Sequence, residues 1–279
     1  QSGAQTHVGP DMVEGEHRRS LTLPALARRW ENAGMPDTRT AAAALDPTAL
    51  ERFGVYAASV AKADLPADVI HAAKRCVIDW YATTLPGAVE APATMLEKAL
   101  ADELDRGEAA LMLGRKSAVR TAALINGTAS HTVEFDDIYA PAIYHPGSPT
   151  IAAALAVGQA RGASGDAFLR AVIAGYEVST RIGAAMGRAH YKYWHNTGTI
   201  GPFGAAAAAG LLVGLDGRQH GHALATVATF AAGLQQAFRG DSQSKPLHAG
   251  HAADAGVLAA LSAEHGLLGA PAILDAAGG

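Results

Sequence analysis

Between His131 and His145 the chain holds two histidines and three carboxylates, which belong to Glu134, Asp136 and Asp137. A carboxylate can hold an imidazole in one tautomer, and such a pair can move protons near neutral pH. Charged residues make up only 17% of the chain. A group this dense is therefore a candidate for acid–base catalysis. The alternative is an acidic helix end followed by an ordinary loop.

A second polar segment, Tyr193–Thr199, precedes an alanine-rich stretch that we expect to be helical. His195 and Thr197 would then lie at the start of a helix. Free backbone N–H groups and the helix dipole make such a position a natural anion site. The alternative is simple capping, with His195 in an aromatic cluster.

A third polar segment runs from Asp241 to Gly250 and again precedes a predicted helix. Lys245 stands before Pro246, which favours an extended backbone and suits a lysine that points at a carboxylate. The alternative is a solvated loop lysine. Arg239 lies close in sequence and would add a second cation.

Other chemistries find little support in the sequence. The histidine pairs His220/His222 and His248/His251 have no carboxylate at ligand spacing, and HExxH is absent, so we predict no metal site. No glycine-rich phosphate loop follows a strand, and there is no serine nucleophile motif. The lone Cys76 cannot form an internal disulfide or hold an iron–sulfur cluster. We expect a buried structural thiol and no cofactor.

Composition indicates a soluble globular protein with a large core, since 49% of the 279 residues are hydrophobic. A net charge of −4 offers no basic field for nucleic acid. The longest apolar stretches, such as 204–213, fall short of the roughly 18 residues that cross a membrane. The start of the chain lacks the apolar region of a signal peptide. We therefore expect a cytoplasmic protein that binds neither nucleic acid nor membrane.

Apolar residues recur at helical spacing from Asp46 onward, and no run alternates with period two. We expect helices over residues 47–63, 66–86, 91–106, 117–131, 150–161, 167–186, 201–212, 218–232 and 248–265. The sequence thus predicts a mostly α domain over residues 46–279. Residues 1–45 mix glycine, proline and charges, and we predict a mobile extension with one short helix near 23–32.

The three polar segments together resemble a known family. The run from His131 to Ser148 is similar to the His-x-x-Asp-Phe-Asp-Asp…His-Pro stretch of the MmgE/PrpD family. Residues 193–197 resemble its Trp-His-Pro-Thr segment. Residues 244–253 resemble its Thr-Lys-Pro-Leu-His-x-Gly-x-Ala-Ala signature. The resemblance runs from about Pro47 to the C-terminus. Three departures stand out: Glu134 replaces a usual Asp, Ile138 a common Thr and Asn196 a common Pro.

The resemblance implies a family of 2-methylcitrate dehydratases, cis-aconitate decarboxylases and an iminodisuccinate epimerase, which work without a redox cofactor. It implies an all-helical first domain, a smaller α/β lid domain, a homodimer and an active site between the two domains. The sequence stops at Gly279, about where the helical domain would end, so we expect the lid to be absent from this chain. We expect either a truncated or split product, or a separate chain that carries the lid.

We predict a cofactor-independent lyase that dehydrates 2-methylcitrate or a related hydroxy acid by removing a proton next to a carboxylate. His145 would be the general acid/base, oriented by Asp137, and Lys245 and His195 would bind substrate carboxylates. We assign catalytic roles to His145, Asp137, Glu134 and Lys245, and substrate binding to His195, Asp136 and Thr197. The alternatives are a decarboxylase or epimerase of a similar substrate, or an inactive helical scaffold that needs a lid-bearing chain.

Overall fold

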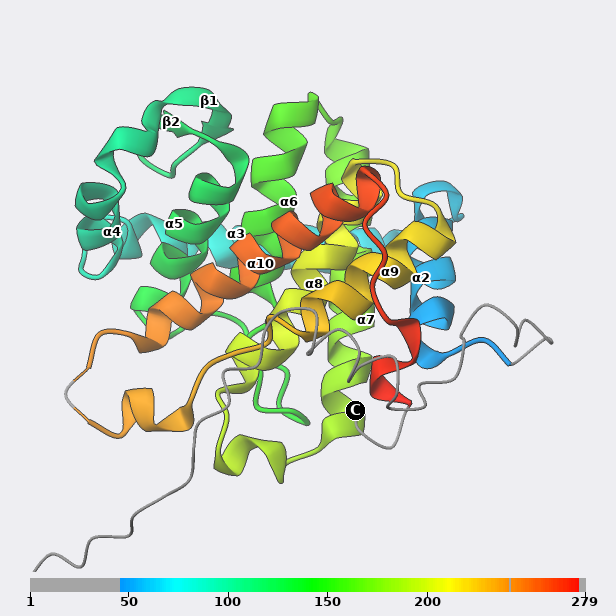
Figure 1. Ribbon diagram of the computed structural model, residues 1–279. Helices are drawn as coiled ribbons and strands as arrows, with labels where there is room; N and C mark the ends of the chain where they lie inside the picture. Colours follow the sequence, from blue (N-terminus) through cyan, green and yellow to red (C-terminus); the bar gives the residue numbers. More distant parts are fainter. Residues whose placement is uncertain (1–45, 241, 276–279) are drawn as a thin grey trace, which may run out of the picture. The chain divides into compact units, whose positions relative to one another are not determined.

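The computed structural model describes residues 46–240 and 242–275 (Figure 1). The chain divides into two units, Gln1–Asp46 and Pro47–Gly279, and every described helix and strand belongs to the second. The extension predicted for residues 1–45, with its short helix near 23–32, lies outside the described residues.

The described residues are mostly helical, as the sequence predicted. The helices are α2 (Ala49–Ser59), α3 (Ala67–Gly87), α4 (Ala93–Ala99), α5 (Val119–Thr132), α6 (Gly147–Arg161), α7 (Gly165–Met186), α8 (Asn196–Leu212), α9 (Gly217–Ala228) and α10 (Lys245–Glu264). Short 3₁₀ turns occupy Val60–Lys62, Ala101–Glu103, His190–Lys192, Gln235–Phe238 and Pro271–Leu274. Strands β1 (Leu104–Ala110) and β2 (Lys116–Ser117) pair antiparallel. None of the described helices is long and apolar enough to cross a bilayer.

The start of α2 shows how local chemistry places a helix end. The Thr48 hydroxyl accepts a hydrogen bond from the Glu51 N–H, and the Thr48 N–H donates to the Glu51 carboxylate at 2.8 Å. This reciprocal capping box satisfies two N–H groups that the helix leaves free. Thr48 is therefore the N-cap of α2, because it has a glutamate three residues later.

The helix predicted over 91–106 is wrong in its second half. α4 ends at Ala99, and the strand β1 begins at Leu104. Asp105 and Gly107 have φ of 59° and 79°, which no α-helix accepts. Leu104 and Ala109 of the strand are buried against the main hydrophobic core. Burial of these apolar side chains therefore outweighs the helical pattern of the sequence.

The centre of the helical unit is α8, which packs against α6, α7, α9 and α10. Its run Ala205–Ala209 is fully buried, and such small side chains let neighbouring helix backbones approach closely. α5 packs against α3, α6 and α10 (Figure 1). α10 therefore packs against α5, α6 and α8, the helices next to the other two polar segments. The end of α5 and the starts of α6, α8 and α10 supply the candidate site.

Candidate active site

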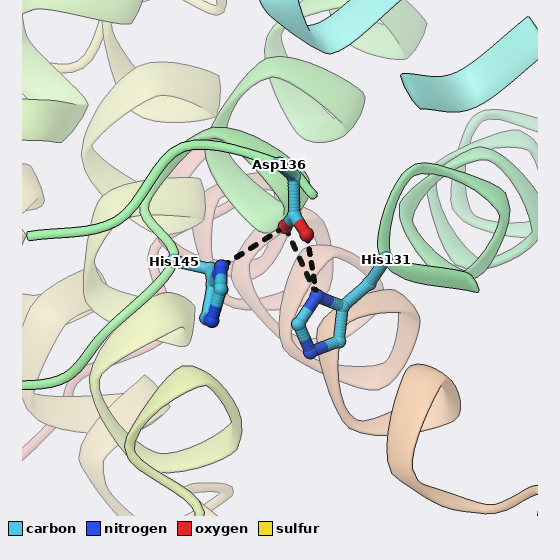
Figure 2. A group of neighbouring side chains, drawn as sticks. All are labelled: His131, Asp136 and His145. Carbon is cyan, nitrogen blue, oxygen red and sulfur yellow. Dashed lines mark hydrogen bonds and ion pairs between the residues drawn. The ribbon is translucent and has the colours of Figure 1, made fainter. Parts of the chain in front are cut away.

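His131, Asp136 and His145 lie together around the loop that joins α5 to α6 (Figure 2). His131 belongs to the last turn of α5, which ends at Thr132. His145 lies two residues before α6 begins at Gly147. The side chains of His131 and Asp136 are buried, whereas 18% of the His145 side chain is exposed. His145 is thus the most exposed of the three side chains.

Asp136 is the centre of this group. Its Oδ2 and Oδ1 lie 3.0 and 3.2 Å from His131 Nδ1, and Ser148 Oγ donates to Oδ2 at 2.6 Å. His145 Nδ1 lies 3.4 Å from the same Oδ2, an ion-pair distance without hydrogen-bond geometry. The two imidazole centroids are 4.7 Å apart. One carboxylate therefore faces two histidines.

The charges of this group control its pKa values. Burial alone would raise the pKa of Asp136, but the hydrogen bond with His131 and the nearby charges of His131 and His145 outweigh it and hold that pKa well below the usual range. Burial alone would lower the pKa of His145, but Asp136 outweighs it and raises that pKa above its usual value. Asp136 is therefore ionised, and it favours the protonated form of His145.

Asp137 does not orient His145, contrary to the prediction. Its Oδ1 accepts from the Gly147 N–H at 3.0 Å and its Oδ2 from the Tyr176 hydroxyl at 2.8 Å. Its own N–H donates to Asp79 Oδ2 at 3.0 Å. Burial raises the pKa of Asp137 to about 6, although the Tyr176 and Gly147 hydrogen bonds oppose the change. Asp137 thus ties the loop to α3, α6 and α7.

Glu134 and Lys245 form an ion pair between the α5–α6 loop and the start of α10. Glu134 Oε2 lies 2.5 Å from Lys245 Nζ, with 47% of the Glu134 side chain and 16% of the Lys245 side chain exposed. Glu134 has a φ of 57°, a left-handed conformation that costs a non-glycine residue about 1–2 kcal/mol. Strain of this kind is found disproportionately at functional sites. The loop therefore holds Glu134 in an unfavourable conformation while its carboxylate meets Lys245.

Lys245 is the first residue of α10, not an extended loop residue as predicted. Pro246 fits the first helical turn because its missing N–H would have no helical partner there. The preference for an extended residue before proline is therefore overridden at this helix start. Lys245 Nζ lies 5.2 Å from the centroid of the Phe238 ring.

His195 and Thr197 lie at the start of α8, which begins at Asn196, five residues earlier than predicted. His195 is the N-cap residue, and its ring stacks 5.5 Å from that of His131. Burial, together with nearby His131 and His248, lowers the pKa of His195 to about 2, so the ring is neutral. Thr197 Oγ1 accepts from the His145 N–H at 3.3 Å. The start of α8 therefore supports the His145 backbone.

The fold brings the predicted residues together, except that Asp137 lies behind them as a loop anchor. His131, Ser148 and Phe238 also shape the site, but we assigned them no role from sequence. His131 lies within the polar segment and precedes Asp136 by five residues, which was the available signal. Phe238 contacts both Lys245 and the His195 ring, which lies 5.2 Å from it centroid to centroid. Sequence offered no signal for that contact.

Two imidazole nitrogens and a carboxylate oxygen of His131, Asp136 and His145 lie within 4.8 Å of one another, a set that suits a small divalent cation. The carboxylate, however, already accepts hydrogen bonds from His131 and Ser148. We interpret the group as a hydrogen-bonded charge network. His220 and His222, a pair considered from sequence, do not share a partner. His220 Nδ1 contacts the Asp216 carbonyl, and His222 Nδ1 contacts the Gly269 carbonyl.

The family model "MmgE/PrpD N-terminal domain" matches residues 51–279. The chain therefore belongs to the MmgE/PrpD family, as its three polar segments indicated.

Several relatives bear the name of one activity. "Cis-aconitate decarboxylase-like protein oryM" of Aspergillus oryzae is 32% identical over 223 residues, which cover 76% of this chain and 46% of that protein. Cis-aconitate decarboxylase of Homo sapiens is 37% identical over 159 residues, or 55% of this chain and 33% of that protein. The Aspergillus terreus enzyme of the same name is 28% identical over 228 residues, or 79% and 46%. The chain spans less than half the length of these relatives.

Proposed function

We propose that this chain supplies the helical half of the active site of a cofactor-independent lyase that acts on a small polycarboxylate. The observation that carries the proposal is that the Lys245–Glu134 ion pair and the Asp136–His145 pair lie close enough for the Lys245 charge to act on His145. Lys245 also contributes to the electrostatic environment of both His145 and His195. An ammonium group that binds a carboxylate would therefore stand beside an imidazole that can move a proton.

The lyase reactions under consideration share one difficult step, which is a proton transfer at a carbon next to a carboxylate. Negative charge develops on that carboxylate during the step. Cations and hydrogen-bond donors already in place stabilise this charge, and loss of one such group typically costs about 10²–10³-fold in rate. Lys245 and His195 are our choices for these positions, with His145 as the proton donor or acceptor.

We favour decarboxylation of cis-aconitate, because this activity names the relatives in both fungi and mammals. The bond between the CH₂ carbon and its carboxylate breaks and CO₂ leaves. The released electron pair forms a double bond to the central carbon, and the pair of the former double bond takes a proton. One proton is consumed and itaconate forms. His145, whose protonated form Asp136 favours, would donate that proton.

The roles of two aspartates change under this proposal. Asp136 was predicted to bind substrate, but its carboxylate already meets His131 and Ser148 and would repel a substrate carboxylate. We now assign it the orientation of His145, the role first given to Asp137. Asp137 becomes the anchor of the loop through Gly147 and Tyr176. Thr197 remains a predicted substrate ligand, with its hydroxyl also holding the His145 N–H.

Dehydration of 2-methylcitrate, our first expectation, is the second candidate. It needs a base to remove a proton and an acid to release hydroxide as water. Glu134 could accept the proton, since it stands beside Lys245 with 47% of its side chain exposed. This direction of proton flow would require His145 to protonate the leaving group. Epimerisation of a similar substrate would use the same groups to remove a proton from a carbon and return one to its opposite face, with only that C–H bond broken and re-formed.

The deciding experiment incubates the purified chain, alone and mixed with a separate lid-bearing chain, with cis-aconitate and with 2-methylcitrate. Proton NMR would follow itaconate and 2-methylaconitate. We expect itaconate, and a loss of at least about 100-fold in rate for His145→Gln. The matched control is His71→Gln, an exposed histidine on α3. Equal rates for the two variants would refute the role of His145.

Three further expectations belong to the proposal. A homodimer would be seen as twice the 28.5 kDa mass in light scattering. A lid-bearing partner chain would be captured as a stable complex that restores turnover, whereas turnover by this chain alone would refute the inactive-scaffold alternative. A cytoplasmic location would be seen by fractionation of cells that produce the protein.

A further inference from the structure

His195 and His248 meet between the starts of α8 and α10, where their Nδ1 atoms lie 3.0 Å apart. His195 is 1% exposed, while His248 is partly buried. Their ring centroids are 5.2 Å apart. The two residues are 53 positions apart in the chain, so the contact depends on the packing of α8 against α10.

Gly233 braces this pair. Its carbonyl accepts a hydrogen bond from the His195 N–H at 2.9 Å. Its φ is 129°, which L side chains rarely adopt, and an added Cβ would lie 3.0 Å from His248 Nδ1. Because Gly233 has no side chain, it can hold the His195 N–H and also lie directly against the His248 ring. The contact between the two rings is therefore supported from the backbone.

Both rings are neutral near pH 7, because burial lowers the pKa of His195 to about 2 and also lowers the pKa of His248. A hydrogen bond between two neutral Nδ1 atoms needs one N–H and one lone pair. Only two arrangements satisfy this requirement. If His248 donates, His195 carries its proton on Nε2; if His195 donates, its Nε2 is a lone pair.

We propose that His248 is a positioning residue, whose Nδ1–H donates to His195 Nδ1 and so holds His195 in the tautomer with its proton on Nε2. This inference rests on the proposed function, in which His195 binds a substrate carboxylate. A carboxylate only accepts hydrogen bonds, so a neutral imidazole must offer it an N–H. Nδ1 of His195 faces His248, and the N–H must therefore be on Nε2.

Lys245 and His248 are three residues apart on α10, and residues at this spacing lie on one helix face. One helix turn thus supplies the cation for a substrate carboxylate and also sets the proton position of the neighbouring donor. Phe238 packs against both Lys245 and the His195 ring. Lys245, Phe238 and the His195 ring therefore lie side by side.

The test is ¹⁵N–¹H NMR of the chain labelled in its histidine rings, which reports the protonated nitrogen of each ring. His195→Gln assigns the His195 signals. His248→Leu removes the donor, and His248→Asn replaces it with an amide N–H near the Nδ1 position. His251→Asn is the matched control, because His251 lies one turn further along α10 with an exposed ring.

We expect His195 to carry its proton on Nε2 in the wild type, His248→Asn and His251→Asn. In His248→Leu the ratio of the Nε2–H to the Nδ1–H form should fall roughly five- to tenfold, as expected for one lost hydrogen bond. A proton on Nδ1 in the wild type would overturn the proposal, even if His248→Leu did not fold. Addition of cis-aconitate tests the proposed function separately, since unmoved His195 signals would refute substrate binding without changing the observed tautomer.

Discussion

Glu134 Oε2 lies 2.5 Å from Lys245 Nζ, although 111 positions separate the two residues in the chain. The contact joins the α5–α6 loop to the first residue of α10. It exists because α5 and α10 pack against one another. The strained backbone of Glu134 and the mostly covered ammonium of Lys245 distinguish this pair from an ordinary surface ion pair.

Glu134→Gln should lower turnover far more than stability. The Glu134 side chain is 47% exposed, so loss of its charge should change the free energy of unfolding by no more than about 1 kcal/mol. Glu134 holds the Lys245 ammonium, and loss of a positioned cation should cost about 10²-fold or more in rate. Urea unfolding and the itaconate assay measure the two effects. Glu177→Gln, which breaks an exposed ion pair with Arg181 on α7, should leave turnover unchanged. Equal turnover of both variants would exclude a catalytic Glu134.

Asp136→Asn should reverse the direction of the His145 pKa shift. Without the carboxylate charge, burial becomes the main influence, and the pKa of His145 should fall below its usual value. The buried His131 would also lose its hydrogen bond to a charged partner, which should cost about 1.5–3 kcal/mol of stability. NMR titration of the His145 ring and urea unfolding measure these changes. A His145 pKa that stays raised would show that another group supplies the charge.

Asp137→Asn should change how stability depends on pH. The pKa of Asp137 is about 6 in the folded protein and near 3.9 in an unfolded chain. Between these values the folded state binds more protons, so this group's contribution to the free energy of unfolding falls as pH rises from 4 to 6, by about 1–3 kcal/mol. His195, with its lowered pKa, acts in the opposite direction. Its contribution to the free energy of unfolding is lost as pH falls below about 6.5.

Because His195 is present in both proteins, the difference between the wild type and Asp137→Asn isolates Asp137. Urea unfolding at pH 4, 5 and 6 should show the wild type losing stability relative to the variant as pH rises. A difference that does not change with pH would mean that the Asp137 carboxyl titrates at its ordinary value.

Gly147→Ala should destabilise the junction of the loop with α6. An added Cβ would lie 2.7 Å from Asp137 Oδ1 and 2.8 Å from the Tyr176 hydroxyl, so we expect a loss of about 1–3 kcal/mol. Gly165→Ala is the matched control, because Gly165 is also the first residue of its helix but has no atom within 4 Å of an added Cβ. It should be neutral or stabilise by up to about 1 kcal/mol. Equal melting temperatures would show that the loop moves freely to accept a methyl group.

The sequence determined the helical class, most helix positions and the three polar segments, because helical periodicity and caps depend on residues within a few positions of each other. Leu104–Ala110 escaped this reasoning, since its strand conformation comes from pairing and core burial. The pre-proline rule likewise failed at Lys245, where a helix start accepts the proline.

Only the tertiary structure decided which of the two aspartates contacts the histidines. Asp136 and Asp137 are adjacent and chemically identical, so no local pattern distinguishes them. The packing of α5, α6 and α7 turns Asp136 toward His131 and His145, and Asp137 toward Gly147 and Tyr176. The Glu134–Lys245 and His195–His248 contacts have the same origin. They join residues 111 and 53 positions apart, and small buried residues on α8 and α10 let the backbones come close enough for them to meet.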